Sequence, residues 1–158
     1  MKKSDRSGLI LYGILSLVVL CVIYGQSMLP PKESGEFSGF VVTFLKPLLD
    51  PFSLWEADVF HLFIRKLGHF TEYAFFSFFF GKFSSIVGKQ KKKQYISLPL
   101  LVMLSVAVSD EFLQSFTGRG SSVADIVLDF AGGVFGLLFV SFFGYLSYKR
   151  SKIYETGL

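Results

Sequence analysis

Long runs of apolar residues alternate with more polar segments along the whole chain, as is typical of helical membrane proteins. Four of these runs come close to the roughly 20 residues that a helix needs to cross the hydrocarbon core of a bilayer. They cover about residues 8–24, 67–87, 96–116 and 123–148. The pattern therefore predicts an all-α, polytopic membrane protein, in which a bundle of four transmembrane helices forms one domain over residues 1–158.

The first run follows Lys2, Lys3 and Arg6, and a cleaved signal peptide and a retained signal anchor share this form. The residues that leave the run, 23–27, contain no Ala-x-Ala cleavage motif. We therefore expect a retained signal anchor.

The connection between the first two runs, residues 25–66, contains a further helical pattern. Its apolar residues recur at helical spacing and form a stripe opposite Ser38, Thr43 and Lys46. The stripe consists of Phe37, Phe40, Val41, Phe44, Leu45 and Leu48. Because Pro47 follows closely and disfavours a long regular helix, we expect a short helix lying in the outer interface of the membrane.

Basic residues mark one side of the membrane. They precede the first run, separate the second from the third, and follow the fourth. They are Lys2, Lys3 and Arg6; Lys89, Lys91, Lys92 and Lys93; and Lys149, Arg150 and Lys152. Because cytoplasmic segments are rich in Lys and Arg, we expect a multi-pass protein of the cell membrane with both termini in the cytoplasm. Residues 25–66 and 117–122 then face outward.

The composition supports a membrane protein and argues against other classes. Hydrophobic residues make up 51% of the chain and its mean hydropathy is +0.52, which is too apolar for a soluble domain of this length. The membrane-flanking cations account for the net charge of +4, so the bilayer is the expected partner and nucleic acid is not. The single cysteine, Cys21, lies inside the first run, so we predict neither a disulfide nor a cysteine metal site.

Three stretches carry polar residues that a simple membrane anchor would not need. They lie near the predicted outer ends of the second, third and fourth runs. Their polar residues are Lys66, His69, Glu72 and Tyr73; Asp110, Glu111 and Gln114; and Arg119, Asp125 and Asp129. With a helical rise of about 1.5 Å per residue, Glu72, Asp110 and Asp129 lie about 9–10 Å inward from the outer ends. A carboxylate at that depth needs a partner or a proton, so we expect these stretches to meet in one site.

The residue types at this site suit acid–base chemistry. Adjacent carboxylates such as Asp110 and Glu111 raise each other's proton affinity, and His69 could act as a base or nucleophile. These three residues are therefore the candidate catalytic residues, and the other polar residues of the three stretches are candidate binding residues. The alternative to a functional site is a structural network, in which these polar residues only stabilise the contacts between the helices. The acids and the histidine are not a diagnostic ligand set, so no metal site is predicted and no cofactor is identified.

The start of the fourth run contains two structural signals. Ser121 or Ser122 can cap the helix, with Asp125 in its first turn. Gly132 and Gly136 form a small-xxx-small face that lets another helix approach closely. Asp129 shares that face, and we expect it to point into the bundle.

These stretches resemble the VanZ-like family of small membrane proteins. The matching motifs are Arg65-Lys66-x-x-His69-Phe70-x-x-Tyr73, Asp110-Glu111-x-x-Gln114-x-Phe116 and Arg119-x-x-Ser122-x-x-Asp125-x-x-x-Asp129-x-x-Gly132. The pair Gln26-Ser27 after the first run also resembles the family and joins the candidate binding residues. The family often has proline where Gly118 stands here. The resemblance covers about residues 9–145.

The resemblance implies a phenotype rather than a reaction, because the founding member is associated with low-level resistance to teicoplanin and related lipoglycopeptides. These antibiotics act on cell-wall precursors at the outer membrane face. The first hypothesis is therefore a bacterial protein that binds or alters a phospholipid or lipid-linked cell-wall precursor headgroup. A lipid-phosphate hydrolase or transferase that uses His69 is the second, and a non-catalytic accessory protein is the third.

Overall fold

The computed structural model describes residues 3–91 and 96–156 and consists of helices. They are α1 (Lys3–Ser27), α2 (Pro31–Leu49), α3 (Ala57–Lys91), α4 (Ser97–Phe116) and α5 (Val123–Thr156). The chain is 88% helical, and the described residues contain no strand, which confirms the all-α prediction. Of the basic residues predicted to be cytoplasmic, Lys2, Lys92 and Lys93 lie outside the described residues.

Three of the described helices are long and apolar enough to cross a membrane. These segments are Asp5–Ser27, Ser97–Phe116 and Val123–Ser147, and they correspond to three of the four predicted spans. The remaining predicted span is the second apolar run, residues 67–87. It lies within α3 and is not confirmed as a membrane span. It contains His69, Glu72 and Lys82, whose polarity lowers the mean hydropathy of the segment.

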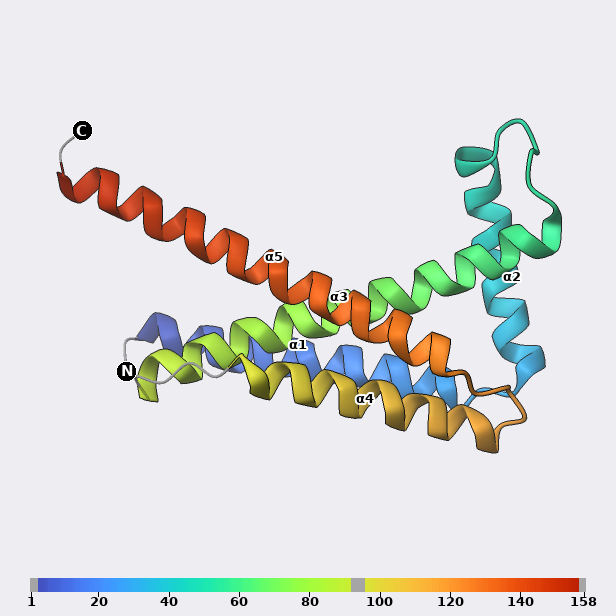
Figure 1. Cartoon of the computed structure of the whole chain (residues 1–158), viewed down its shortest axis with the longest axis horizontal. Coiled ribbons are helices and arrows are strands. Elements are labelled where there is room, and N and C mark those ends of the chain that lie inside the picture. Colours follow the sequence, from blue (N-terminus) through green and yellow to red (C-terminus); the bar gives the residue numbers. More distant parts are fainter. Residues whose placement is uncertain (1–2, 92–95, 157–158) are drawn as a thin grey trace.

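The helices run alternately in opposite directions along one bundle. Figure 1 shows α1 and α4 running one way and α3 and α5 running the other. Both ends of the described chain therefore lie at the same end of the bundle, together with the C-terminal end of α3. At the opposite end, α1 and α4 finish and α5 begins.

Apolar packing holds the bundle together and also covers its outer surface. Tyr73 and Phe76 of α3 pack with Ile23 of α1 and Met103 of α4 in the main core. Apolar side chains on the outward faces are exposed, as expected for helices that meet lipid rather than water. Among them are Leu17, Leu101, Val127 and Leu138, each 62–63% exposed.

The α3–α5 crossing depends on glycines. A Cβ atom at Gly132 would overlap the carbonyl oxygen of Phe70, and one at Gly136 would overlap the carbonyl oxygen of Ala74. Close backbone approach also lets the Ser77 hydroxyl donate a hydrogen bond of 2.6 Å across the interface to the carbonyl oxygen of Gly133. The predicted small-xxx-small face is therefore confirmed, and α3 is the helix that it contacts.

The helix in the first connection is longer than expected. Helix α2 has 19 residues and continues through Pro47, so the prediction that this proline limits it to a short helix is wrong. Pro47 lies in the last turn, and the backbone hydrogen bond that its missing N–H would have donated to the carbonyl oxygen of Thr43 is lost. Val42 packs against Phe60 and Ile64 of α3, while Phe40 and Phe44 on the other face are 73% and 74% exposed. The interfacial position of that exposed face stays a prediction.

Candidate functional site

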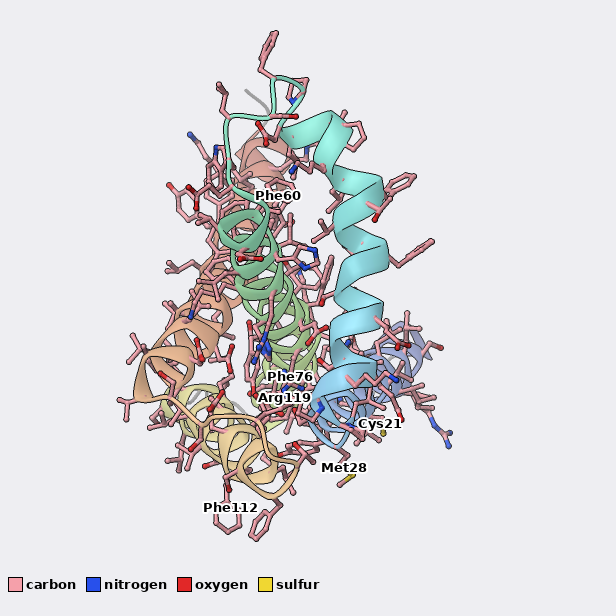
Figure 2. All side chains as sticks on the ribbon, turned by 90° about the vertical axis from the view of Figure 1, so that its right-hand side faces the viewer. Cys21, Met28, Phe60, Phe76, Phe112 and Arg119 are labelled. Atoms are coloured by element: carbon pink, nitrogen blue, oxygen red, sulfur yellow. The ribbon has the colours of Figure 1, made fainter. Side chains whose placement is uncertain are left out.

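The predicted site residues come together at the end of the bundle where α1 and α4 finish and α5 begins. The middle of α3 passes through this region, so four helices and the α4–α5 connection contribute side chains. Figure 2 views the bundle from this end and places Arg119 near its centre, while Phe112 points away from the bundle. The arrangement matches the expectation that polar residues from separate helices lie at a similar depth.

Asp110 accepts two buried hydrogen bonds in this region. It is 0% exposed, and both of its carboxylate oxygens accept hydrogen bonds. The hydroxyl of Ser27 donates to Oδ1, and the side-chain amide of Gln114 donates to Oδ2 over 3.0 Å. Asp110 therefore joins the end of α1 to α4 and is held in one orientation.

Gln26 links three parts of the chain. Its side-chain amide donates to Oε1 of Glu72 over 2.7 Å, which ties α1 to α3. Its backbone carbonyl accepts a hydrogen bond of 3.0 Å from Nη1 of Arg119. The pair Gln26-Ser27 thus lies inside the site, and its partners come from α3, α4 and the α4–α5 connection.

A tight turn after α4 brings Arg119 inward. Gly118 has a φ of +77°, a left-handed conformation that glycine adopts without strain. The backbone N–H groups of Thr117 and Arg119 both donate to the carbonyl oxygen of Gln114, at 3.1 and 3.2 Å. This closes the C-terminus of α4 and turns the chain back over the end of the bundle.

Arg119 is held without a direct ion pair. It is only 9% exposed, and no carboxylate in the described part of the chain lies within ion-pair distance of its guanidinium. Burial lowers the pKa of this guanidinium from its ordinary value, and the charge of Arg65 lowers it further, while nearby carboxyl groups act in the opposite direction. Its bond to Gln26 uses one of five N–H donors, so the group retains donors for an anion.

Glu111 and Ser122 fix the start of α5. The backbone N–H of Ser122 donates to Oε2 of Glu111 over 2.8 Å, and the Ser122 hydroxyl accepts the N–H of Ala124 at 3.1 Å. Ser122 therefore caps the helix as predicted. Asp125 lies in the first turn of α5, as predicted, and its carboxylate forms an ion pair of 2.5 Å with Lys66 of α3.

His69, Asp110 and Asp129 face one another from three helices. Each offers one ligand atom, and these atoms all lie within 4.8 Å of one another. His69 Nδ1 lies 3.7 Å from Asp129 Oδ1, too far for a hydrogen bond. Neither oxygen of the buried Asp129 has a hydrogen-bond partner, and neither does the hydroxyl of Tyr73 nearby. The site thus contains a fixed set of acids and one imidazole, several of whose polar atoms remain unpaired.

Two residues of this region were missing from the predicted set. Thr117 donates a hydrogen bond of 3.3 Å to the carbonyl oxygen of Ser27, and Arg65 adds positive charge near His69 and Arg119. Arg65 lies one helical turn before His69, so helical spacing could have identified it. The backbone acceptor of Thr117 gives no signal in the sequence.

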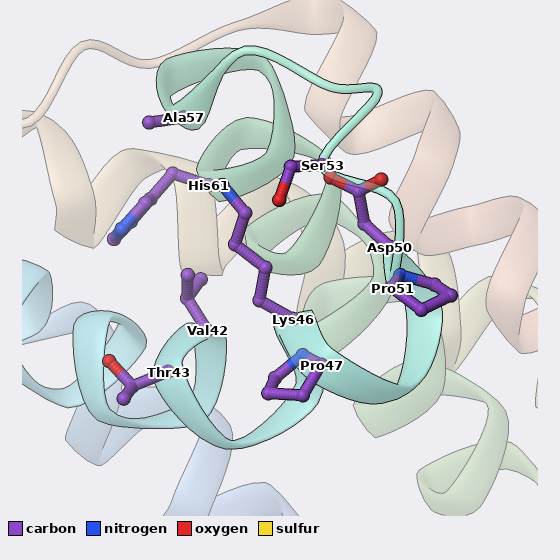
Figure 3. Close-up of a pocket in the computed structure, with 9 residues that line it drawn as sticks. All are labelled: Val42, Thr43, Lys46, Pro47, Asp50, Pro51, Ser53, Ala57 and His61. Carbon is purple, nitrogen blue, oxygen red and sulfur yellow. The ribbon is translucent and has the colours of Figure 1, made fainter.

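A separate groove lies between α2 and the start of α3 (Figure 3). Its volume is about 590 Å³, and Lys46 of α2 and His61 of α3 line it. None of the predicted site residues lines this groove. The groove is therefore distinct from the cluster of predicted site residues at the end of the bundle.

A helical bundle with membrane-spanning segments and a cluster of buried charged residues defines an integral membrane protein. The model of the VanZ/LLP1 family matches residues 12–144, so the chain belongs to this family. The match covers α2, α3 and α4 completely, parts of α1 and α5, and all of the predicted site residues. No curated protein and no solved structure matches the chain.

Proposed function

We propose that the protein acts at the outer face of a bacterial cell membrane, where it binds the phosphate-bearing headgroup of a lipid or lipid-linked cell-wall precursor. The observation that carries this proposal is the position of Arg119. Its guanidinium is nearly buried at the end of the bundle and makes no ion pair within the described residues. A positively charged fork with free donors in a protected site suits phosphate.

The charges around Arg119 support a headgroup that carries both anionic and polar groups. Lys66 lies at the rim, where its side chain is 41% exposed, and Arg65 adds a second exposed cation. Glu72 and Glu111 are bound to Gln26 and to the backbone of Ser122, so they do not neutralise Arg119 directly. Hydroxyl or amide groups of a sugar or peptide headgroup could pair with the acids.

The proposed topology places this site on the outer side. Helices α1 and α4 run in the same direction, so the chain must return along the bundle between them, and α3 follows that return path (Figure 1). We infer that α3 supplies the fourth crossing, with its polar residues turned into the bundle. The basic residues at the opposite end then face the cytoplasm, with both termini, and α2 lies along the outer interface.

Resistance to teicoplanin and related lipoglycopeptides is the phenotype expected of such a protein. This expectation comes from the family and from the outer location of the proposed site. Binding a precursor headgroup, or altering it, changes what these antibiotics meet at the membrane surface.

Binding of labelled polyprenyl phosphate to the purified full-length protein in nanodiscs tests the proposal. Replacing Arg119→Gln should weaken binding at least tenfold, since one charge-assisted phosphate contact contributes about 1.5–3 kcal/mol. Arg150→Gln is the matched control, because Arg150 is exposed at the far end of α5. Equal binding by the Arg119→Gln variant and the parent protein would remove the observation on which the proposal stands.

Hydrolysis or group transfer at the bound phosphate is a second candidate function, and the arrangement of His69 beside Asp129 favours it. In hydrolysis, a water molecule would attack phosphorus while His69 accepts its proton. The bond from phosphorus to the lipid oxygen would break, and that oxygen would take up a proton from solvent. Asp129, which lies 3.7 Å from the ring, would stabilise the protonated imidazole through its charge.

Turnover of a labelled lipid phosphate distinguishes this candidate from simple binding. Release of the label by the parent protein, and its loss in a His69→Gln variant with normal lipid binding, would support catalysis. Lipid binding without turnover in the parent protein would favour an accessory role. His61→Gln is the control, because His61 lies outside the site.

A further inference from the structure

The geometry points to a divalent metal ion bound by His69, Asp110 and Asp129 at the buried centre of the site. We propose this centre as an addition to headgroup binding, and it stands on contacts that do not involve Lys66 or Arg119. Its ligands come from the middle of α3, the end of α4 and the first turns of α5.

The distances within the cluster suit one ion. At metal–ligand distances of about 2.0–2.2 Å, two ligands of the same ion lie about 3–4.4 Å apart, depending on the angle between them. The separation of 3.7 Å between His69 Nδ1 and Asp129 Oδ1 falls within this range. The ligand atoms of all three residues lie within 4.8 Å of one another, so shifts of about 1 Å or less would bring them to the spacing of about 3.4 Å that a tetrahedral centre requires.

The unpaired atoms of Asp129 provide independent support. Asp129 is 0% exposed, yet neither of its carboxylate oxygens has a hydrogen-bond partner. His69 Nδ1 is also buried and unpaired, and it faces the same space. Buried polar atoms are nearly always satisfied, and a cation between the two side chains would satisfy all three of these atoms.

Asp110 is already held as a metal ligand needs to be. Hydrogen bonds from Ser27 and Gln114 fix the orientation of its carboxylate, and each oxygen keeps a further lone pair. Such supporting hydrogen bonds are usual around carboxylate ligands and raise metal affinity. The unpaired hydroxyl of Tyr73, which lies near Asp110 and Asp129, could contribute a further oxygen.

The donor set indicates which class of metal the centre would select. One imidazole with two carboxylates suits Zn²⁺ or Mn²⁺ better than Ca²⁺ or Mg²⁺, which prefer oxygen ligands throughout. Arg119 lies close enough to His69 to act on it electrostatically, near the centre of the same end of the bundle. A metal at this position could therefore contact the same phosphate that Arg119 is proposed to bind.

A shared proton is the competing explanation for the cluster. A proton between His69 and Asp129 would draw the two atoms to hydrogen-bond distance, near 2.8 Å. The separation of 3.7 Å is wider and leaves room for an ion. The two explanations therefore differ in a measurable way, because only one of them requires a metal.

Metal binding is measured on the purified full-length protein in nanodiscs, after removal of metals with a chelator. Mn²⁺ is the probe, and its binding is followed by electron paramagnetic resonance in lipid that lacks polyprenyl phosphate. We expect about one bound ion per chain with a nitrogen modulation from His69, and competition by Zn²⁺. Absence of stoichiometric binding, or bound Mn²⁺ without a nitrogen signal, would overturn the proposal even if every variant failed to fold.

Matched variants locate the ion. Asp129→Asn and His69→Gln should each weaken Mn²⁺ binding by at least a factor of ten. Asp58→Asn and His61→Gln repeat the same chemical changes at exposed positions and should bind like the parent protein. Arg119→Gln should also keep the metal, so failure of headgroup binding and failure of the metal centre are told apart. Parent-like affinity in the Asp129→Asn variant would contradict the assignment.

Discussion

Both ends of the bundle carry charged residues, but the two ends use them in opposite ways. At the end that holds Arg119, the charged side chains are mostly buried and bind one another or the backbone, as Glu72 and Glu111 do. At the other end, Lys89, Lys149 and Arg150 are exposed. The first arrangement specifies a site, whereas the second leaves charges available to water and lipid headgroups. Burial and partners, together with residue type, therefore distinguish a functional cluster from a topological signal.

The largest expected loss of stability comes from a substitution at the α3–α5 crossing, which brings the site residues together. Gly132→Leu should destabilise the protein by about 3 kcal/mol or more, because the new side chain would overlap the backbone of α3. Gly144→Leu is the control further along α5, where a Cβ would meet no atom within 4 Å. Thermal unfolding in detergent compares the two variants. Similar midpoints would show that the close approach of α3 and α5 does not hold the site together.

Asp110 should be next in importance. Asp110→Ala should cost about 2–3 kcal/mol, since the buried donors of Ser27 and Gln114 would lose their acceptor. Asp58→Ala removes a carboxylate from an exposed position and should change stability by less than about 0.5 kcal/mol. The free energy of unfolding, measured by denaturant titration in mixed micelles, checks the difference. Equal losses of unfolding free energy in the two variants would mean that the buried hydrogen bonds of Asp110 add no stability beyond that of an exposed carboxylate.

The cap of α5 should have a smaller effect. Ser122→Ala should destabilise by about 1 kcal/mol, because its hydroxyl caps the N–H of Ala124. Ser121→Ala makes the same change at the neighbouring exposed serine and should be close to neutral. The unfolding midpoints of the Ser122→Ala and Ser121→Ala variants test this prediction. A lower midpoint for Ser121→Ala than for Ser122→Ala would mean that Ser121 caps the helix.

The ion pair at the rim should contribute least to stability. Lys66→Gln should cost about 0.5 kcal/mol, because both partners are partly exposed and the pair is screened by salt. Lys149→Gln at the opposite end should cost nothing measurable. Stability at low and high salt tests this, and the cost at Lys66 should fall as salt rises. A large, salt-independent cost would place Lys66 among the buried residues that specify the site.

Sequence patterns identified which faces would meet, but not which atoms. Helical spacing placed Asp129 and Gly132 on one face and brought Asp110 to the same depth, and the structure agrees. Spacing could not show that Arg119 binds a backbone carbonyl, because any residue offers that acceptor. It also could not reveal that His69, Asp110 and Asp129 come within 4.8 Å, so the sequence alone predicted no metal centre.

The lengths of α2 and α3 were the weakest predictions for a related reason. Hydropathy locates the longest apolar part of a helix, whereas α3 begins at Ala57, before the predicted run, in a segment that packs against α2. Packing of Phe60 and Ile64 against Val42 extends both helices beyond their apolar patterns. Such tertiary contacts override the local signal that Pro47 gives.

The central claim is that the charged cluster opens to the outside of the cell, and accessibility of single cysteines tests it most directly. In a Cys21→Ser background, Gly120→Cys lies in the exposed α4–α5 connection and Lys89→Cys lies near the opposite end of α3. A membrane-impermeant maleimide applied to intact cells should label the cysteine at 120 and should reach the one at 89 only after permeabilisation. Labelling at 89 and protection at 120 in intact cells would place the site on the cytoplasmic side and contradict the account.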